Sequence, residues 1–299
     1  LAYYNVKKLP QRAYEEMEKA FALDETDARV YLELDQLKKR LNVAVKERWS
    51  DMEKHFDLVE SRDDLYLEYV TLLNTLGEPE KALGLIKARK FHQWEGGEGK
   101  VAAQYLTALY QLAKAAVEKE DYAEAKELLL RAVGEYPHNL GEGKLESGQE
   151  NNLYYLLGLV QEKLGEAKDA FESLTRACCG ESEPVGMMYY NDQPPEMIYY
   201  QGLAYRMLGE EEQAVRRFQK LVDYGREHIG DEIKIDYFAV SLPDLLIFEE
   251  NLNERNRKHC LFMMSLGLRG LGQTDEAKAC AEELLSMDNA HQGIRVHDL

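Results

Sequence analysis

Basic residues, cysteines and long apolar runs are all scarce in this sequence of 299 residues. It has 37 lysines and arginines against 55 aspartates and glutamates, for a formal charge of −18. Because nucleic acids and anionic membranes both attract clustered positive charge, we expect neither of them as a partner. The longest apolar runs are also much shorter than the stretch of about 20 residues that crosses a bilayer as a helix.

The four cysteines, Cys178, Cys179, Cys260 and Cys280, lack the spacing of metal ligands. A disulfide between the adjacent Cys178 and Cys179 would be strained within a helix. Reduced thiols are typical of a reducing compartment, and the sequence has no signal-peptide pattern. We therefore expect a cytoplasmic protein with no metal and no cofactor.

Strand signals are nearly absent, and a two-helix pattern returns six times in their place. In the clearest copy, bulky and small residues share one face of each helix: Tyr154, Leu157 and Gly158, then Ala170, Leu174 and Ala177. Four more copies fit this template, at Tyr66, Tyr69, Val70, Leu73, Ala82 and Ile86; Leu109, Leu112, Ala113, Ala116, Ala125, Leu129 and Ala132; Ile198, Gln201, Gly202, Tyr205, Ala214, Phe218 and Leu221; and Leu261, Met264, Ser265, Leu268, Ala277, Ala281 and Leu284. A unit this short cannot bury its apolar face alone, so the copies must stack on one another.

The sixth copy departs from the template. It begins at Tyr31, Leu34 and Asp35, and its second helix carries Glu47 and Asp51 where apolar residues are expected. We interpret it as a degraded repeat.

The pattern resembles the tetratricopeptide repeat, whose signature is an aromatic residue, Leu-Gly and Tyr in one helix and Ala, Phe and Ala in the next. The resemblance implies an all-α fold, a right-handed α-α superhelix of helical hairpins with inserted loops. Tyr4 falls where a first helix should end, so we expect the chain to be a fragment that begins inside a repeat. We predict a single domain over residues 1–299, with regular repeats in 1–90, loop-inserted repeats in 91–228, an insertion in 229–257 and a last repeat in 258–299.

Insertions interrupt the stack at equivalent places. The connection from Ala20 to Tyr31 has the normal length, whereas three later connections are about ten residues longer and a fourth is about thirty longer. Since equivalent loops of a solenoid align along one side, we expect the first three insertions to form one surface, here called the loop edge: residues 91–100, 136–152 and 187–195. The fourth insertion carries Ser241 and Pro243, which predict one or two short helices packed on the stack.

The loop edge holds the candidate binding residues. They are His92, Trp94, Glu95, Glu98 and Lys100 in the first insertion, His138, Asn139, Glu142 and Lys144 in the second, and Tyr189, Tyr190, Asn191, Asp192 and Gln193 in the third. Their aromatic faces are typical of binding surfaces, and the shared Gly-Glu-Gly-Lys allows close approach of a partner. The alternative is that these loops pack only on each other.

Three catalytic or ligand-binding interpretations of the same loops have weak support. Gly-Glu-Gly-Lys lacks the Ser or Thr and the preceding strand of a phosphate loop. His92 and His138 have no third metal ligand nearby in the sequence. Glu95, Glu98 and Glu142 suit a glycosidase pair only at a defined separation, so we assign no catalytic residue.

The loops also carry a second resemblance, to the C-terminal repeat region of large bacterial proteins with a domain of unknown function labelled DUF5107. The segments that carry it are 91–100, 136–144, 190–195 and 234–244. The resemblance implies a bacterial protein with a missing N-terminal half and a link to carbohydrate.

We therefore expect a non-enzymatic scaffold that binds another protein, or its own N-terminal domain, on a concave face built largely from first helices and on the loop edge. The alternative is a carbohydrate-binding or carbohydrate-processing accessory region, whose loop edge contacts a sugar or completes an active site on a missing domain. Whether the full-length protein is an enzyme, for example a carbohydrate-active one, stays open at this point.

Overall fold

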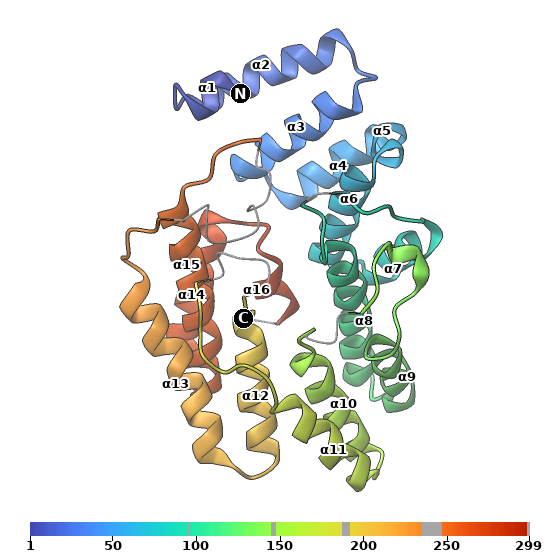
Figure 1. Ribbon diagram of the computed structural model, residues 1–299, viewed down its shortest axis with the longest axis vertical. Helices are drawn as coiled ribbons and strands as arrows, with labels where there is room; N and C mark the ends of the chain where they lie inside the picture. Colours follow the sequence, from blue (N-terminus) through green and yellow to red (C-terminus); the bar gives the residue numbers. More distant parts are fainter. Residues whose placement is uncertain (95, 145–147, 187–191, 235–246, 298–299) are drawn as a thin grey trace.

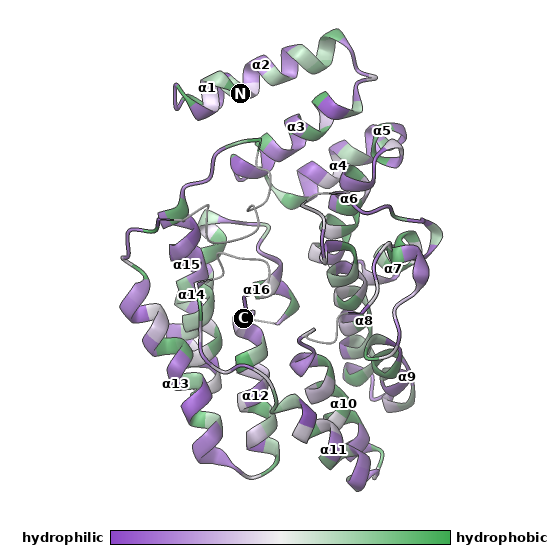
Figure 2. Ribbon diagram, in the orientation of Figure 1, coloured by the Kyte–Doolittle hydropathy of each residue, from purple (hydrophilic) through white to green (hydrophobic). Residues whose placement is uncertain are grey.

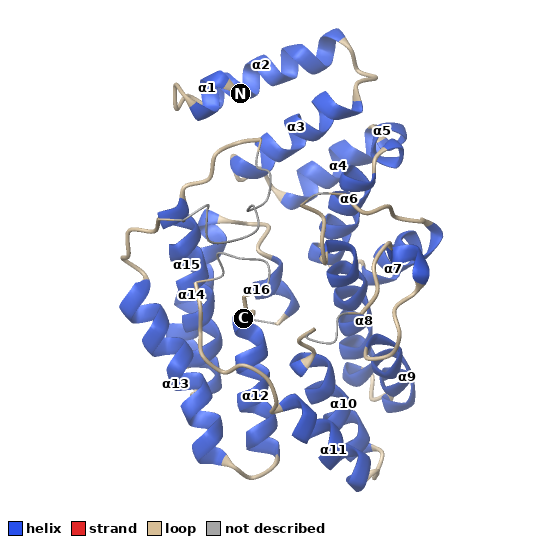
Figure 3. Cartoon of the chain, viewed as in Figure 1, coloured by secondary structure: helices blue, strands red, loops and turns tan. Residues whose placement is uncertain are grey.

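The computed structural model describes residues 1–94, 96–144, 148–186, 192–234 and 247–297. In this part of the chain all regular structure is helical, with sixteen α-helices and one short 3-10 helix, η1 (Figure 3). Their bounds are α1 (Ala2–Asn5), α2 (Pro10–Leu23), α3 (Ala28–Arg40), α4 (Val45–Lys54), α5 (Phe56–Ser61), α6 (Asp63–Thr75), α7 (Pro79–Ala88), α8 (Lys100–Glu118), α9 (Tyr122–Ala132), η1 (His138–Leu140), α10 (Asn151–Lys163), α11 (Ala167–Ala177), α12 (Pro195–Met207), α13 (Glu211–His228), α14 (Leu252–Gly270), α15 (Thr274–Met287) and α16 (Gln292–Val296).

Five pairs of neighbouring helices form hairpins where the repeat pattern predicts them: α6–α7, α8–α9, α10–α11, α12–α13 and α14–α15 (Figure 1). The first helix of each pair also packs on the first helix of the next pair. Most of the template residues are buried, so the pattern marks the helix faces that meet. The predicted all-α helical-repeat fold is confirmed.

The small residues of the template allow the two helices of a hairpin to cross closely. A Cβ atom added to Gly158 of α10 would lie 2.7 Å from Cγ of Leu174 in α11, which is too close for a real contact. Between these helices, Gly165 has a φ of +77°, in the left-handed region that glycine adopts most easily.

In the three middle hairpins, α8–α9, α10–α11 and α12–α13, the first helix is more hydrophobic than the second. The first helices α6 and α8 are largely hydrophobic, whereas the second helices α11 and α13 are largely hydrophilic (Figure 2). This agrees with a stack in which first helices contact neighbours on several sides and second helices face solvent.

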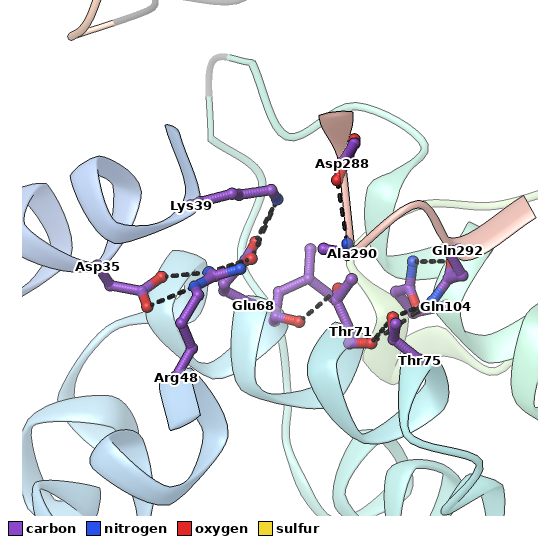
Figure 4. A network of polar contacts seen from close by, with 11 residues as sticks. Asp35, Lys39, Arg48, Glu68, Thr71, Thr75, Gln104, Asp288, Ala290 and Gln292 are labelled. Atoms are coloured by element: carbon purple, nitrogen blue, oxygen red, sulfur yellow. Dashed lines mark hydrogen bonds and ion pairs between the residues drawn. The ribbon is translucent and has the colours of Figure 1, made fainter. Parts of the chain in front are cut away.

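In the degraded copy, buried charge replaces apolar packing (Figure 4). The guanidinium of Arg48 in α4 donates to both carboxylate oxygens of Asp35 in α3, at 3.0 and 2.6 Å, and to Glu68 in α6 at 2.7 Å. Lys39 donates to Glu68 as well, at 3.0 Å. Burial raises the pKa of Glu68, but the positive charges of Lys39 and Arg48 outweigh it and hold that pKa at about 2. This network joins three helices through ionic contacts.

The described part of the fourth insertion, residues 229–234 and 247–257, contains no helix other than the first turns of α14, which begins at Leu252. Ser241 and Pro243, which predict a helix start, lie outside the described residues. The end of this insertion reaches across to the other end of the stack. There, Asn5 donates to the carbonyl of Ile247 at 3.0 Å, and Phe248 is buried with its ring edge-on to Tyr4.

These contacts close the stack into a ring (Figure 1). The loop after α3 also meets the last turn of α15, where Asn42 donates to the carbonyl of Ser286 at 3.1 Å. Helix α16 turns inward and lies inside the ring. The concave face of the superhelix is therefore the inner surface of the ring.

Candidate functional site

The first two insertions of the loop edge are hydrogen-bonded to each other. The backbone N–H of Phe91 donates to the carbonyl of Asn139 at 2.8 Å. The side-chain amide of Asn139 then donates to the carbonyls of Ile86 and Arg89, at 2.7 and 2.8 Å. Asn139 thus satisfies backbone acceptors at the end of α7 that the helix itself leaves open.

Gly141 is required where the two loops cross. Its φ is +83°, and a Cβ atom there would lie 3.0 Å from the carbonyl oxygen of Phe91. A larger residue would be strained in its backbone and would push the loops apart.

The two Gly-Glu-Gly-Lys segments are used differently. In the second, the carboxylate of Glu142 accepts from the backbone N–H of Gly99 at 2.9 Å and lies 3.5 Å from that of Ala102. These groups belong to the start of α8, whose free N–H groups favour a negative partner. In the first segment, Glu98 is exposed. The second carboxylate therefore caps the helix that the first segment begins.

His92 lies at the outer rim, with 79% of its side chain exposed. Its backbone N–H and its Nδ1 atom both contact Asp63, at 2.9 and 3.1 Å, and Arg89 donates to the same carboxylate at 2.6 Å. Burial raises the pKa of Asp63, but the hydrogen bonds from His92 and Arg89 outweigh it and lower that pKa overall.

A cleft lies between the two loops and encloses about 370 Å³. Its walls are formed by His92, Gln93, Trp94, Gly97, Glu98, Val101, Leu140, Gly141 and Glu142. Trp94 is half-buried and lies against Gly97, where a Cβ atom would come within 2.2 Å of the indole. Only a residue without a side chain at position 97 allows the indole to pack this closely.

The remaining candidates lie apart from this cleft. Lys144 donates to the carbonyl of Val133 at 2.6 Å and pairs with Glu150 at 2.8 Å, while His138 and Lys100 are exposed. In the third insertion, the side chain of Gln193 is buried and donates to the carbonyl of Glu181 at 3.0 Å. Asp192 and Gln193 do not line the cleft. Glu95, Tyr189, Tyr190 and Asn191 lie outside the described residues.

Sequence reasoning missed a second group of polar residues, on the inner surface of the ring. Gln104 of α8 and Gln292 of α16 form a reciprocal pair there, and Asn42 pairs with Asn289. Single amides on separate helices carry no local motif. Only their proximity in the fold identifies them.

The part of the chain that the structure describes has no cluster of side chains with metal-binding chemistry. It contains no group of three or more His, Cys, Asp or Glu side chains that could hold a metal ion. Burial raises the pKa of Cys178 to about 12 and that of Cys260 to about 11, so both remain thiols at neutral pH. The helices found there are all too short or too polar to cross a membrane.

Family models described as tetratricopeptide repeat match three stretches of the chain, residues 107–139, 196–224 and 259–291. They fall on the hairpins α8–α9, α12–α13 and α14–α15. These matches, together with the hairpin geometry, show that the chain contains tetratricopeptide repeats and is a helical-repeat scaffold for protein–protein interaction. Scaffolds of this class are generally non-enzymatic, which fits the chain.

Solved structures that are similar to this chain include two that are titled as TPR proteins. One is MamA, at 18% identity over 73% of this chain and 92% of that one, with a TM-score of 0.25. Another is YrrB, titled a TPR protein with an unusual peptide-binding site, at 17% identity over 82% and 97% with a TM-score of 0.28. A third is the TPR domain of P58(IPK), at 17% identity over 96% and 71% with a TM-score of 0.32.

Proposed function

We propose that this scaffold binds a polypeptide segment of its partner in the cleft of the loop edge. The observation that carries the proposal is that the cleft is already formed. The hydrogen bond between Phe91 and Asn139 and the glycine at position 141 hold its two sides together without a partner. A preformed cleft lowers the ordering cost of binding.

The lining of the cleft indicates what the segment would present. Val101 and Leu140 form an apolar floor, and the indole of Trp94 forms one wall. Glu98 adds an exposed carboxylate at the rim. An apolar side chain followed by a lysine or arginine fits this arrangement, since it would fill the floor and pair with Glu98.

We further propose that this partner is a protein and that the resemblance to DUF5107 proteins makes an N-terminal portion of the same polypeptide one source of it. Gly97 covers one face of the indole of Trp94, so a sugar ring would have to stack on the face that lines the cleft. Any catalytic chemistry of a longer protein would then lie outside residues 1–299.

A random peptide library displayed on phage would test the proposal with the full chain as bait. The selected peptide should bind about tenfold more weakly to Trp94→Ala and to Glu98→Lys, because the first removes a wall and the second reverses the rim charge. Glu98 is exposed, so Glu98→Lys should leave the fold intact, and a loss of binding would report on the cleft itself. Phe171→Ala is the matched control, since Phe171 is an aromatic residue on α11 that is 62% exposed.

Equal binding of the peptide to the wild type and both cleft variants would disprove the site. A glycan-array signal lost in Trp94→Ala, with no peptide selected, would instead favour the carbohydrate alternative.

A further inference from the structure

The segment after α15 turns into the ring instead of running along its outside. Residues 288–297, here called the tail, contain α16 and contact helices of the other half of the molecule (Figure 1). A helix of five residues has no stability of its own in water. Its conformation therefore depends on the surface on which it lies.

The tail is first held by an exchange of amides. The side chain of Asn289 donates to the carbonyl and the Oδ1 atom of Asn42, at 2.7 and 2.6 Å. The backbone N–H of Asn289 donates to the same Oδ1 at 2.8 Å, and the backbone N–H of Val45 donates to Oδ1 of Asn289 at 3.1 Å. Asn289 of the tail thus makes four hydrogen bonds to three groups on the opposite side, the carbonyl and Oδ1 of Asn42 and the N–H of Val45.

One turn further, Gln292 lies on α6 and α8 (Figure 4). The side-chain amides of Gln292 and Gln104 form two hydrogen bonds, each residue donating from Nε2 to Oε1 of the other at 3.1 Å. The Nε2 atom of Gln292 also reaches the carbonyl of Thr71 and the hydroxyl of Thr75, each at 3.4 Å. The pairing is between side chains, so it depends on the residue type at position 292.

The end of the tail is fixed by two further groups. Lys114 of α8 donates to the carbonyl of Val296 at 2.8 Å. The ring of His297 is buried, and its Nδ1 atom lies 2.8 Å from the hydroxyl of Tyr200, which in turn lies 2.6 Å from that of Tyr110. Between these polar contacts, Ile294 and Val296 are buried.

The helices under the tail carry more acceptors than the tail uses. In the described part of the chain, Oδ1 of Asn74 and Oε1 of Gln111 are buried and have no donor. Their amide nitrogens are engaged, to Gln104 and to the carbonyl of Asn74. Since an unpaired buried acceptor costs free energy, a segment that brought a donor to either oxygen would gain a hydrogen bond that the tail does not make.

We propose that the surface formed by Thr71, Thr75, Gln104, Lys114 and Tyr200, here called the interior surface, is a binding site for a short polypeptide segment, and that the tail is its occupant within the same chain. The partner is a segment with the chemistry of the tail: an amide side chain and, five residues later, an imidazole or similar ring. A tethered occupant competes at an effective concentration in the millimolar range, so a partner binds only when the tail leaves. This inference is independent of the cleft at the loop edge.

The test uses the full chain and a fluorescent synthetic peptide of residues 286–297. In the double variant Asn289→Ala, Gln292→Ala the tail is weakened and the interior surface is intact. This variant should bind the peptide about tenfold more tightly than the wild type does, because the occupant in cis is absent more often. Adding Gln104→Ala should remove that gain. Gln219→Ala, a change of an exposed glutamine on α13, should match the wild type.

Hydrogen exchange gives a second measurement that needs no variant. Excess unlabelled peptide should speed exchange in residues 288–297 of the wild-type chain and leave α6 and α8 protected, since the peptide replaces the tail on an intact surface. Two results would overturn the proposal: no gain of peptide binding in the double variant, or faster exchange throughout the ring in that variant. Either would mean that the tail is a part of the core.

Discussion

The loop edge and the interior surface use polar side chains in opposite ways. At the loop edge, Asn139 and Glu142 stand in conspicuous motifs, but their contacts are to backbone groups at the ends of α7 and the start of α8. On the interior surface, Gln104 stands in no motif and pairs with a side chain of a distant segment. A distinctive loop motif in a helical repeat can therefore mark how helices begin and end, while amides outside any motif make the specific side-chain pairing.

The two regions also differ in how far apart the segments that they join lie in the fold. The contacts at the loop edge join neighbouring hairpins, whereas those of the interior surface join the two halves of the ring. Changes at the loop edge should consequently act on local helix stability, and changes at the interior surface on closure of the ring. The following predictions test this contrast.

Asn139→Ala should have the largest effect. The carbonyls of Ile86 and Arg89 would lose their donor, and the free energy of unfolding should fall by about 3 kcal/mol. Urea denaturation followed by circular dichroism would measure it. His138→Ala is the control, because that neighbouring side chain is exposed and its loss should change the value by less than about 0.5 kcal/mol. If both variants had the same free energy of unfolding, the hydrogen bonds of Asn139 would not stabilise the loop edge.

The second largest effect should come from lowering the pH, which weakens the packing of His297 against the interior surface. Burial, with Lys114 and His291 nearby, lowers the pKa of His297 from 6.5 to about 3, and the groups around its ring also include Tyr110 and Tyr200. The folded chain thus favours the neutral ring. The contribution of the neutral His297 ring to the free energy of unfolding is complete above pH 6.5 and is lost as the pH falls from 6.5 toward 3.

Between pH 7 and pH 5 this loss should reach about 2 kcal/mol, measured as the change in free energy of unfolding. Burial lowers the pKa of His291 as well, so that residue adds to the slope in the same direction. His297→Gln should therefore show a smaller slope with pH than the wild type. Identical slopes would contradict the prediction.

The smallest effect separates the two glutamates of the repeated Gly-Glu-Gly-Lys. Glu142→Ala removes the carboxylate at the start of α8 and should cost about 1 kcal/mol. Glu98→Ala removes an exposed carboxylate and should cost almost nothing. Thermal melting of both variants under the same conditions would decide. Equal losses would mean that the cap at Gly99 does not distinguish the two motifs.

The hairpins could be predicted from the sequence because their signal is local. Residues such as Gly158 and Leu174 meet across one tight turn, and helical spacing alone places them on facing sides. The prediction of protein interaction rests on the same repeats. The carbohydrate alternative and the DUF5107 assignment stay predictions, since nothing in the hairpins bears on them.

The sequence could not predict contacts whose two sides lie far apart. In the sequence Arg48 is a single arginine with no evident partner, and only the fold shows that it pairs with both Asp35 and Glu68. The pairing of Asn42 with Asn289 spans most of the chain. At the loop edge, Asn139 and Glu142 could be named as candidates, but their role as caps depends on where Arg89 and Gly99 lie.

The pairing of Asn42 with Asn289 bears on how the chain folds. In an open helical repeat, each hairpin gains its stability from its neighbours, so folding can start at several places and spread step by step. Here the ring cannot close until residue 289 has left the ribosome, when the hairpins have already had time to form. Closure is then a single late event of high contact order, which should appear in refolding kinetics as a slow phase after rapid helix formation.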